Sequence, residues 1–491
     1  MKRKPGEDKA GMALMRMWAR RRHTRYAARK TAVAAVAVSL GAALLAGCSA
    51  NARTGPDRPD NKITVWTLEN LPARMAAEKK MVARFEKKSG VRVELVGVDE
   101  GQLPQLIMSA AASGNLPDVI GSLPLGQAWQ MYGNGLLNTE APADIVKELG
   151  RDTFNPNALE LTSDGPARLT VPSDAWLQLL VYRKDLLKKA GLPAPDSYAT
   201  MLDAARKLDR GRMHGISLAT DPADAFTQQS FEDLALANDC QLVGKGEVTL
   251  DSSACRRTFA TYDELAREHG APGTQTVDTT RATYFAGRSP MMVWSSFLLD
   301  ELSGQRADAV PSCPQCKKNK AFLAENSGIT TALKGPDGKK PVQFGEITSW
   351  AMTKTAETGA SRKFVTYMLS DGYEDWFGMA PEGKIPVRQG TSDDPHKFTR
   401  AWHSSRLGVE AKVRKPLNSI YPDELLDELT EGIGVMRRWG FTQGEGALVG
   451  ATNGELPVPK AIGAMTSGQT SPDEAARESQ DEVDALRRSL R

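Results

Sequence analysis

The feature of this chain that most limits its fold is a repeated alternation of strand-like and helix-like segments. Residues 62–69 alternate in hydrophobicity and are rich in β-branched side chains, a pattern typical of a strand. Residues 74–88 then carry apolar side chains at helical spacing, and Gly90 follows where such a helix ends. The same order continues with a strand, a helix and a short buried strand (91–95, 103–110 and 117–120). Strands joined by helices in this way predict a parallel sheet covered by helices on both faces.

The alternation returns later in the 491-residue chain, which is long enough for two or three domains. Further strands are predicted over 175–182, 214–219, 290–295 and 346–352. Further helices are predicted over 184–190, 197–208, 226–237, 253–268, 297–302 and 361–369. The C-terminal part is predicted to be mainly helical, with Ser471 and Pro472 at the start of the last helix. This pattern favours an α/β protein of two lobes over one continuous barrel.

The N-terminus has the composition of an export leader. Residues 1–30 contain eleven Lys or Arg against two acidic residues, and residues 32–47 carry no charge. The uncharged stretch is shorter than the roughly 20 residues of a membrane-spanning helix and is close to the length of a secretory leader. Outside residues 1–30 the chain has 52 basic and 58 acidic residues, which argues against a nucleic-acid partner bound through phosphate neutralisation.

The leader ends in Leu45-Ala46-Gly47-Cys48, which resembles the lipobox of bacterial lipoproteins. In such proteins the cysteine is acylated and the leader is removed immediately before it. The resemblance implies a signal peptide over 1–47, a lipid on Cys48 and a flexible tether over 48–61. A signal anchor with a buried cysteine is the alternative. Arg20-Arg21-Arg22 leaves open whether export follows the general or the twin-arginine route.

Four cysteines remain after the leader, and an even number in an exported protein predicts disulfides. The favoured pairs are Cys240 with Cys255 and Cys313 with Cys316, because both are local. A zinc site is disfavoured, since only one of the two pairs has C-x-x-C spacing. A redox role for Cys313 and Cys316 is also disfavoured. No metal site and no cofactor are predicted.

Several short motifs follow one another in a defined order along the chain. They are Ile63–Trp66, Gly114–Val119, Val171–Asp174, Leu180–Leu192, Ser197–Leu208, Phe285–Trp294, Gly383–Arg388 and Ala464–Ala476. Together they resemble the landmarks of the extracellular solute-binding proteins of ABC importers, in particular the large family that binds sugars and oligosaccharides. The resemblance extends over residues 62 to 490.

This resemblance implies a two-lobed, periplasmic-binding-protein-like fold of type II, with a hinge and a ligand cleft between the lobes. The first lobe is expected to comprise residues 62–170 and about 300–348, and the second about 171–299 and 349–491. The chain would cross between the lobes near 167–173, 297–302 and 345–350. The protein is expected to be a monomer held by its lipid at the outer face of the cell membrane. Its partners would be a carbohydrate and the permease subunits of an ABC transporter.

A sugar site needs aromatic faces for C–H groups and carboxylates for hydroxyl groups. Trp66 and Glu69 lie at the end of the first strand, where ligands of open α/β sheets bind. Asp174 and Trp176 lie where the resemblance places a lobe crossing, and Trp294 ends a predicted strand. For each tryptophan a core position is equally plausible. Replacing Trp294 with Ala is expected to weaken sugar binding by about 1–3 kcal/mol.

The remaining candidates are weaker. Asp118 fits a loop cap better than a contact to a sugar hydroxyl, and Trp350, Trp376 and Trp402 fit the core. Hydrolytic and nucleotide-binding motifs are absent from the sequence, which argues against an enzyme. Two alternatives stay open: a binder of a non-sugar solute such as a peptide or polyamine, and a secreted glycosidase with paired carboxylates.

Overall fold

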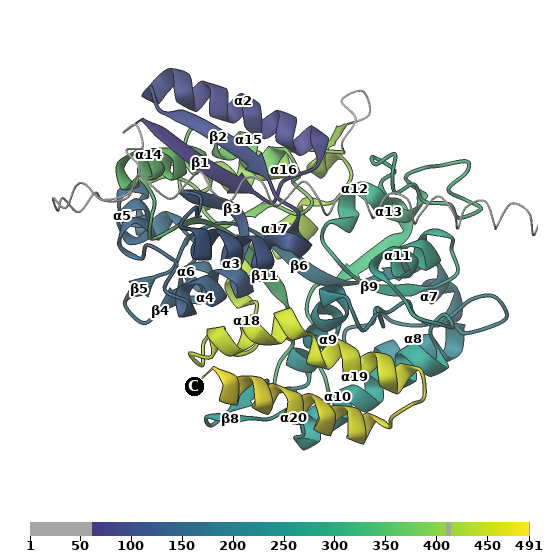
Figure 1. The fold of residues 1–491 in the computed structure, drawn as a ribbon. Helices are drawn as coiled ribbons and strands as arrows, with labels where there is room; N and C mark the ends of the chain where they lie inside the picture. Colours follow the sequence, from purple (N-terminus) through teal and green to yellow (C-terminus); the bar gives the residue numbers. More distant parts are fainter. Residues whose placement is uncertain (1–60, 409–413, 491) are drawn as a thin grey trace, which may run out of the picture. The chain divides into compact units, whose positions relative to one another are not determined.

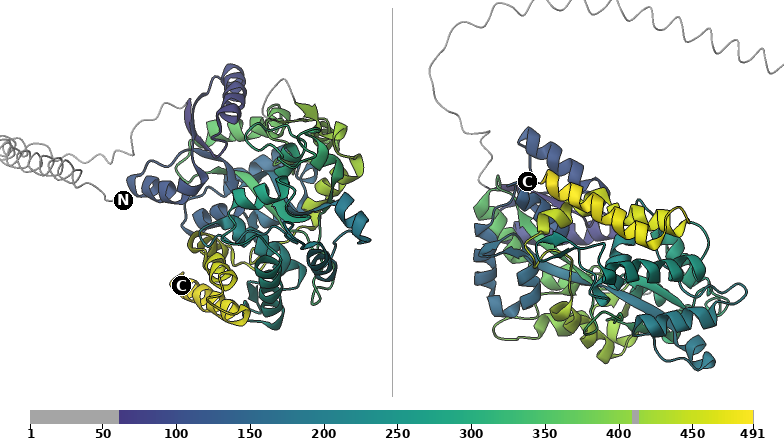
Figure 2. Two further views of the ribbon diagram at one scale, coloured as in Figure 1. Left: turned by 90° about the vertical axis from the view of Figure 1, so that its right-hand side faces the viewer. Right: turned by 90° about the horizontal axis from the view of Figure 1, so that it is seen from below.

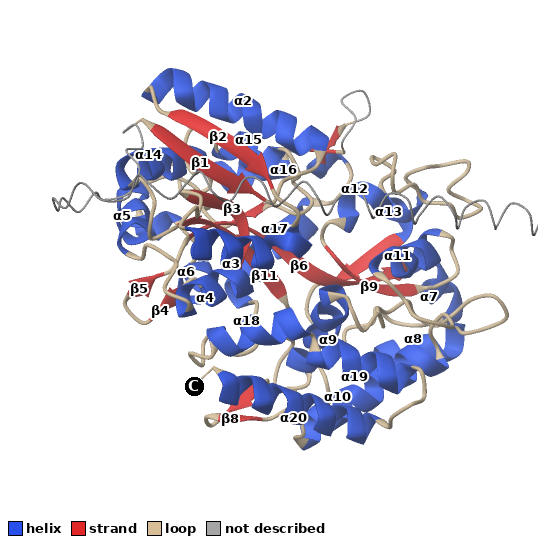
Figure 3. Ribbon diagram, viewed as in Figure 1, coloured by secondary structure: helices blue, strands red, loops and turns tan. Residues whose placement is uncertain are grey.

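The strands predicted at the start of the chain lie side by side in one sheet. In the computed structural model, which describes residues 61–408 and 414–490, β1 (Lys62–Thr67) pairs in parallel with β2 (Arg92–Gly97) and β3 (Val119–Pro124) (Figures 1 and 3). The predicted parallel sheet is therefore confirmed at this point. The predicted signal peptide, the lipid on Cys48 and almost all of the tether lie outside the described residues.

The other strands complete an eight-stranded sheet. They are β6 (Val171–Arg183), β9 (Met291–Ser295), β10 (Ser327–Thr330), β11 (Gly345–Met352) and β12 (Ile385–Pro386). The order is β10-β6-β11-β3-β1-β2, and β9 and β12 also pair with β6. Three short hairpins lie apart from this sheet: β4 (Ser163–Asp164) with β5 (Ala167–Arg168), β7 (Val243–Gly244) with β8 (Glu247–Val248), and β13 (Arg406–Leu407) with β14 (Lys415–Pro416).

β6 joins two regions of the sheet. Six of its first seven residues pair with β11, all but Ser173 at a register shift, and two of them also pair with β12. Residues 178–182 pair with β9, and 180–183 pair with β10. Because β6 is a single strand of 13 residues, one continuous backbone belongs to both regions.

Helices surround the strands and form most of the C-terminal part (Figure 1). Those before residue 250 are α2 (Pro72–Ser89), α3 (Leu103–Ser113), α4 (Leu125–Gly133), α5 (Glu140–Leu149), α6 (Pro156–Leu161), α7 (Lys184–Ala190), α8 (Tyr198–Leu208) and α9 (Ala225–Ala237). Those after it are α10 (Ser253–Asp263), α11 (Val277–Phe285), α12 (Leu298–Leu302), α13 (Phe322–Asn326), α14 (Thr358–Met368), α15 (Tyr373–Gly378), α16 (Lys397–His403), α17 (Asp423–Val435), α18 (Gly446–Glu455), α19 (Pro457–Thr466) and α20 (Pro472–Ser489).

Helix ends follow the signals in the sequence. Gly90 ends α2 in the left-handed conformation with φ of 73°, which a residue without Cβ adopts readily. Ser197 begins α8 and Ser471 begins α20, each through a reciprocal pair of side-chain hydrogen bonds with the third helical residue. Local capping therefore sets these boundaries.

Two predicted elements differ from the structure. The strand predicted over 214–219 is wrong: the segment has one bridge, from Ser217 to Met292. The N–H groups of Gly215 and Ile216 instead donate to the carbonyl of His269, so the backbone pairs with a loop. The helix predicted over 253–268 is α-helical only to Asp263 and continues as a π turn over Glu264–Glu268.

The last three helices, α18, α19 and α20, pack against helices from earlier parts of the chain (Figures 1 and 2). α18 packs against α4, whereas α19 packs against α9 and α20 against α10. A Cβ on Gly446 of α18 would lie 2.1 Å from the Trp129 ring of α4, so this close helix contact requires glycine. α14 and α15, which fall in the range expected for the second lobe, contact α2. The predicted lobe ranges stay a prediction.

Among the helices of residues 61–408 and 414–490, none is both long enough and apolar enough to span a membrane.

Residues 61–408 and 414–490 contain two disulfides, Cys240–Cys255 and Cys313–Cys316, and the four cysteines that form them are buried. The first closes a loop across 15 residues and the second across three. The longer loop restricts the unfolded chain more strongly, so we expect the first disulfide to contribute more to stability.

Replacing Cys240 and Cys255 together with Ala is expected to lower the free energy of unfolding by about 3 kcal/mol, because the unfolded chain regains its freedom. Replacing Cys313 and Cys316 together is the matched control and should cost about half as much. Urea unfolding followed by circular dichroism measures both losses. Equal losses from the two pairs would contradict this explanation.

Candidate functional site

A cavity of about 140 Å³ lies at the carboxyl ends of the first three strands. Glu69 follows β1, Glu100 follows β2, and Ser122 lies in the second half of β3. Its lining residues are Leu68, Glu69, Arg74, Glu100, Ser122, Pro124, Asp174, Trp176, Gln229, Phe297, Glu346, Thr348, Gly383 and Lys384. Carboxyl ends of parallel strands are the usual ligand position in open α/β sheets.

A buried cation joins two of the predicted carboxylates at the floor of this cavity. Lys384 Nζ lies 2.6 Å from Glu69 Oε1 and 3.3 Å from Asp174 Oδ2. It also donates to Ser122 Oγ at 3.1 Å and lies 4.2 Å from the Trp376 ring centroid. Ser122 adopts a left-handed backbone with φ of 55°, which turns its hydroxyl toward Glu69 at 2.8 Å. The network therefore draws on three separate strands and a distant loop.

The charges of this network are set by their neighbours. Burial alone would raise the pKa of Glu69, but Lys384 and Arg74 outweigh it and lower that pKa to about 2. Burial would lower the pKa of Lys384, but Asp174 and Glu69 outweigh it and raise that pKa. Both groups therefore stay charged near neutral pH.

Asp174 is fully buried and accepts several hydrogen bonds from the protein itself. Its Oδ1 accepts from Ser173 Oγ at 2.7 Å and from the Trp376 indole at 2.6 Å. Its Oδ2 accepts from Thr348 Oγ1 and from Lys384. These donors fix the carboxylate in place and leave it little capacity for a further partner.

Glu100 differs from the two carboxylates on the floor. The residue is exposed, yet the walls of the cleft desolvate its carboxyl, and Glu346 and Glu69 repel its charge. These effects raise the pKa of Glu100 to about 7. Such a group can donate as well as accept hydrogen bonds near neutral pH.

Trp176 supplies an aromatic face to the cavity. The residue is half-buried, and its ring centroid lies 6.5 Å from Phe297 and 6.0 Å from Phe344. The Phe297 ring in turn approaches the backbone of Gly383 so closely that a Cβ there would lie 1.9 Å from it. The Arg74 guanidinium also lies over this ring, 5.7 Å from its centroid. Phe297 therefore closes the cavity between distant segments.

A second buried ion network lies beside the cavity. Arg438 pairs with Glu232 of α9 at 3.1 Å and with Glu346 of β11 at 2.6 Å. Glu346 also accepts from the Leu125 N–H at 3.0 Å. α9 and β11 both contact β6, so this network joins two elements that pack on the same strand.

The predicted site residues are divided by the structure. Glu69, Asp174 and Trp176 line the cavity, whereas Trp66, Asp118 and Trp294 do not. Trp66 is half-buried on β1, between its partners Val96 and Ile120.

Asp118 and Trp294 have structural surroundings of other kinds. Asp118 accepts from the backbone N–H groups of Thr64 and Glu357, both at 2.8 Å, so it fastens two segments of the chain. Trp294 is 4% exposed and packs at 4.7 Å from the Phe226 ring.

The sequence did not single out Arg74, Glu100, Gln229, Phe297, Glu346 and Lys384. Lys384 lies within the motif Gly383–Arg388, and Phe297 follows the strand predicted over 290–295. Both residues are therefore close to a feature that the sequence does show. Glu100 follows a predicted strand at its carboxyl end. Arg74 lies in the first turn of α2 and Gln229 lies further inside α9, and nothing in the sequence around either residue indicates the cavity.

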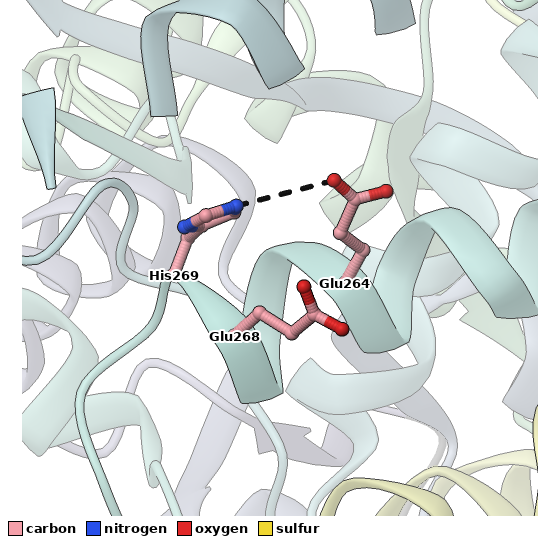
Figure 4. A group of neighbouring side chains, drawn as sticks. All are labelled: Glu264, Glu268 and His269. Atoms are coloured by element: carbon pink, nitrogen blue, oxygen red, sulfur yellow. Dashed lines mark ion pairs between the residues drawn. The ribbon is translucent and has the colours of Figure 1, made fainter. Parts of the chain in front are cut away.

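One cluster outside the cavity has the residue types of a metal site: Glu264, Glu268 and His269 (Figure 4). Arg206 Nε already donates to Glu264 at 2.8 Å, and His269 Nδ1 lies 3.0 Å from Asp209. His269 Nε2 lies 3.9 Å from Glu264. These contacts account for the cluster as an ion-pair network.

Comparison with known proteins identifies the family. Residues 80–404 match the bacterial extracellular solute-binding proteins. The chain belongs to this family. As a solute-binding protein it has a binding role, and the family-level evidence is for binding proteins of transporters and not for enzymes.

A relative of this solute-binding protein is YcjN of Escherichia coli (strain K12), named as a periplasmic-binding protein of an ABC transporter. The two are 27% identical over 474 residues, which cover 93% of this chain and 99% of YcjN. The relationship therefore extends over almost the full length of both proteins.

Solved structures share the fold at lower identity. Maltose-bound MalE3 of T. maritima superposes with a TM-score of 0.65 at 17% identity, over 87% of this chain and 99% of its own. The GacH receptor of Streptomyces glaucescens GLA.O, solved without ligand and with acarbose, gives 0.65 at 20% identity, over 87% and 98%. A sugar transporter protein of Arthrobacter chlorophenolicus A6 with laminaribiose gives 0.64 at 18%, over 86% and 99%. The predicted two-lobed α/β fold is confirmed.

Proposed function

We propose that this solute-binding protein captures a carbohydrate in the cavity at the strand ends and delivers it to the permease of an ABC transporter. The observation that carries the proposal is the meeting of Trp176 with Glu69 and Glu100 around one cavity. An aromatic face suits the C–H groups of a sugar, and carboxyl groups suit its hydroxyls. The ligands of structurally similar proteins, maltose, acarbose and laminaribiose, support this choice.

In this proposal the contacts to the sugar are divided among different elements. Trp176 of β6 stacks on the ring, and Glu100 and Gln229, which also line the cavity, bind hydroxyls. Glu69 accepts a hydroxyl hydrogen bond on Oε2, which has Arg74 as its one donor among the described residues, while Lys384 and Ser122 bind Oε1 and Lys384 keeps the carboxylate charged. Asp174 acts by holding Lys384 in position, because its oxygens already have donors.

Ligand entry requires the cavity to open. Its 140 Å³ is less than the roughly 300 Å³ at the lower end of small-molecule sites. We propose that the lobes part and close around the sugar, with the closed form favoured by contacts made only there. The crossings proposed for this motion are 167–173, 297–302 and 345–350.

A lipid on Cys48 would hold the protein at the outer face of the cell membrane, and residues 48–61 would act as its tether. The protein would act as a monomer and release the sugar unchanged. Its partners would be the permease subunits of an ABC transporter, the class of transporter to which the name of YcjN assigns that relative.

Trp176→Ala is expected to weaken sugar binding by about 1–3 kcal/mol, because the variant loses the stacking face. Isothermal titration calorimetry of the purified protein, against monosaccharides and against maltose and laminaribiose, measures the loss. Trp66→Ala is the matched control: it removes the same side chain outside the cavity and should leave the dissociation constant unchanged. An unaltered affinity in Trp176→Ala would remove this residue from the site.

A thermal-shift assay with sugars, peptides and polyamines tests the alternatives to a sugar ligand. A ligand-dependent rise in melting temperature with a sugar, and none with peptides or polyamines, supports the proposal. A rise only with a peptide or polyamine would replace carbohydrate as the ligand. Product formed from a chromogenic glycoside would indicate a hydrolase instead of a binding protein.

A further inference from the structure

The cavity at the strand ends, called the cleft from here on, is smaller than another cavity among the described residues. A cavity of about 1020 Å³ lies between α5, α6, the β4–β5 hairpin and the loop over 441–444, and it shares no lining residue with the cleft. Its walls include the apolar side chains of Trp129, Leu159 and Phe441. A space of this size is in the range of small-molecule sites, at roughly 300–1,000 Å³.

Arg168 contributes a buried positive charge to this cavity. The residue is 6% exposed, and its Nη1 donates to the Leu159 carbonyl at 2.8 Å and to Thr162 Oγ1 at 3.1 Å. In the part of the chain that the structure describes, Nε and Nη2 have no hydrogen-bond partner and no carboxylate pairs with the guanidinium. Desolvation, and then repulsion by Arg151, lowers the pKa of Arg168 to about 10.

Other buried arginines of this protein are compensated. Arg438 pairs with two carboxylates, and Arg183 pairs with Asp185. Arg388, which is 4% exposed, has no carboxylate, but its Nε, Nη1 and Nη2 each donate to an oxygen of the protein. Arg168 uses only one of its three nitrogens. A buried polar group without a partner is costly, so the two remaining nitrogens of this guanidinium favour a ligand that accepts hydrogen bonds, and its charge favours an anion.

Two more cations line the same cavity. Lys147 and Arg151 are exposed, and neither forms an ion pair with any residue within 61–408 or 414–490. Glu160 and Asp164 also line the cavity, yet no ion pair joins them to the three cations. Three cations and two acids thus line the cavity. Because the cations form no ion pairs with these acids, they are available to a ligand.

We propose that this cavity is a second ligand site, which binds the phosphate or carboxylate group of a small organic anion through Arg168, Arg151 and Lys147. The planar guanidinium of Arg168 presents two free nitrogens to the oxyanion, the geometry that Arg offers to phosphates and carboxylates. The body of the ligand lies against Trp129, Leu159 and Phe441. This site is independent of the sugar cleft and of the function proposed for it.

The test uses the full chain with two probes, inorganic phosphate and citrate, at constant ionic strength adjusted with NaCl. Isothermal titration calorimetry is expected to give a dissociation constant of about 1 mM or below for at least one probe. The tighter probe tells a phosphate site from a carboxylate site. The double variant Lys147→Gln and Arg151→Gln, at exposed positions that leave the fold intact, should weaken binding about tenfold. Arg168→Met should weaken it at least as much.

Two controls make the result specific. The double variant Arg212→Gln and Lys460→Gln removes the same charge at exposed positions outside the cavity and should bind as tightly as the unaltered protein. Trp176→Ala should also leave anion binding unchanged. Absence of binding by both probes would overturn the proposal, as would unchanged binding in Lys147→Gln with Arg151→Gln. If Arg168→Met does not fold, the exposed double variant decides alone.

Discussion

Lys384→Met is expected to lower the free energy of unfolding by about 3–5 kcal/mol, as the loss of one partner from a buried ion network does. Lys384 is 2% exposed and pairs with both Glu69 and Asp174. The methionine fills much of the same volume, so the loss comes mainly from two carboxylates that stay buried without this cation. Denaturant unfolding at pH 7 measures it.

The effect of Lys384→Met should depend on pH in one direction. The pKa of Glu69 is lowered to about 2 from its ordinary value of 4.5, so Glu69 adds stability above about pH 4.5 and loses this contribution as the pH falls toward 2. The variant lacks much of this contribution. The difference between the two proteins is therefore largest above about pH 5 and narrows at lower pH.

Lys397→Met is the matched control for this prediction. Lys397 is exposed on α16 and pairs with the exposed Glu374 at 3.3 Å, so its loss should cost less than about 1 kcal/mol at any of these pH values. Equal losses from the two variants, or a deficit in Lys384→Met that grows as the pH falls, would contradict the role given to Lys384.

Trp294→Ala is expected to cost about 3–5 kcal/mol of stability and to leave sugar affinity unchanged, because the side chain is core. The ring of Trp294 packs on Phe226. Arg281 lies 5.7 Å from the centroid of the Trp294 ring and forms an ion pair with Glu301. This expectation differs from the loss of affinity that the sequence pattern predicts for the same substitution.

Trp176→Ala provides the comparison for Trp294→Ala. Trp176 is half-buried in the cavity wall, so its replacement should reduce affinity more than stability. Melting temperature and sugar affinity measured on both variants separate the two roles. A loss of affinity in Trp294→Ala without a loss of stability would place this tryptophan at the ligand.

Local patterns in the sequence were sufficient for most of the elements. The strands β1, β2 and β3 and the helices between them follow from hydrophobic periodicity and from end signals such as Gly90. The strand predicted over 214–219 was wrong because an apolar composition indicates that a segment is buried, but not that it pairs with a strand. Its N–H groups find the carbonyl of His269, and no local signal indicates that partner.

The site was harder to predict, since it depends on which way each side chain points. Successive side chains of a strand point to opposite faces, and one residue of difference moves a tryptophan from a cleft to a core. Trp176 lies on β6 and Trp294 lies on its partner β9, yet only Trp176 reaches the cavity. Lys384 and Phe297 reach it from loops far apart in the chain, and only the fold brings them together.

The continuity of β6 has a mechanical consequence. Around Leu177 and Gln178 its partner changes from β11 to β9, and the backbone continues without a break. In the opening proposed above, this continuous backbone would act as a torsion element about which the two regions of the sheet swivel without separating. Trp176 stands beside the point of change, so a swivel that widens the entrance would also rotate the indole that meets the incoming solute.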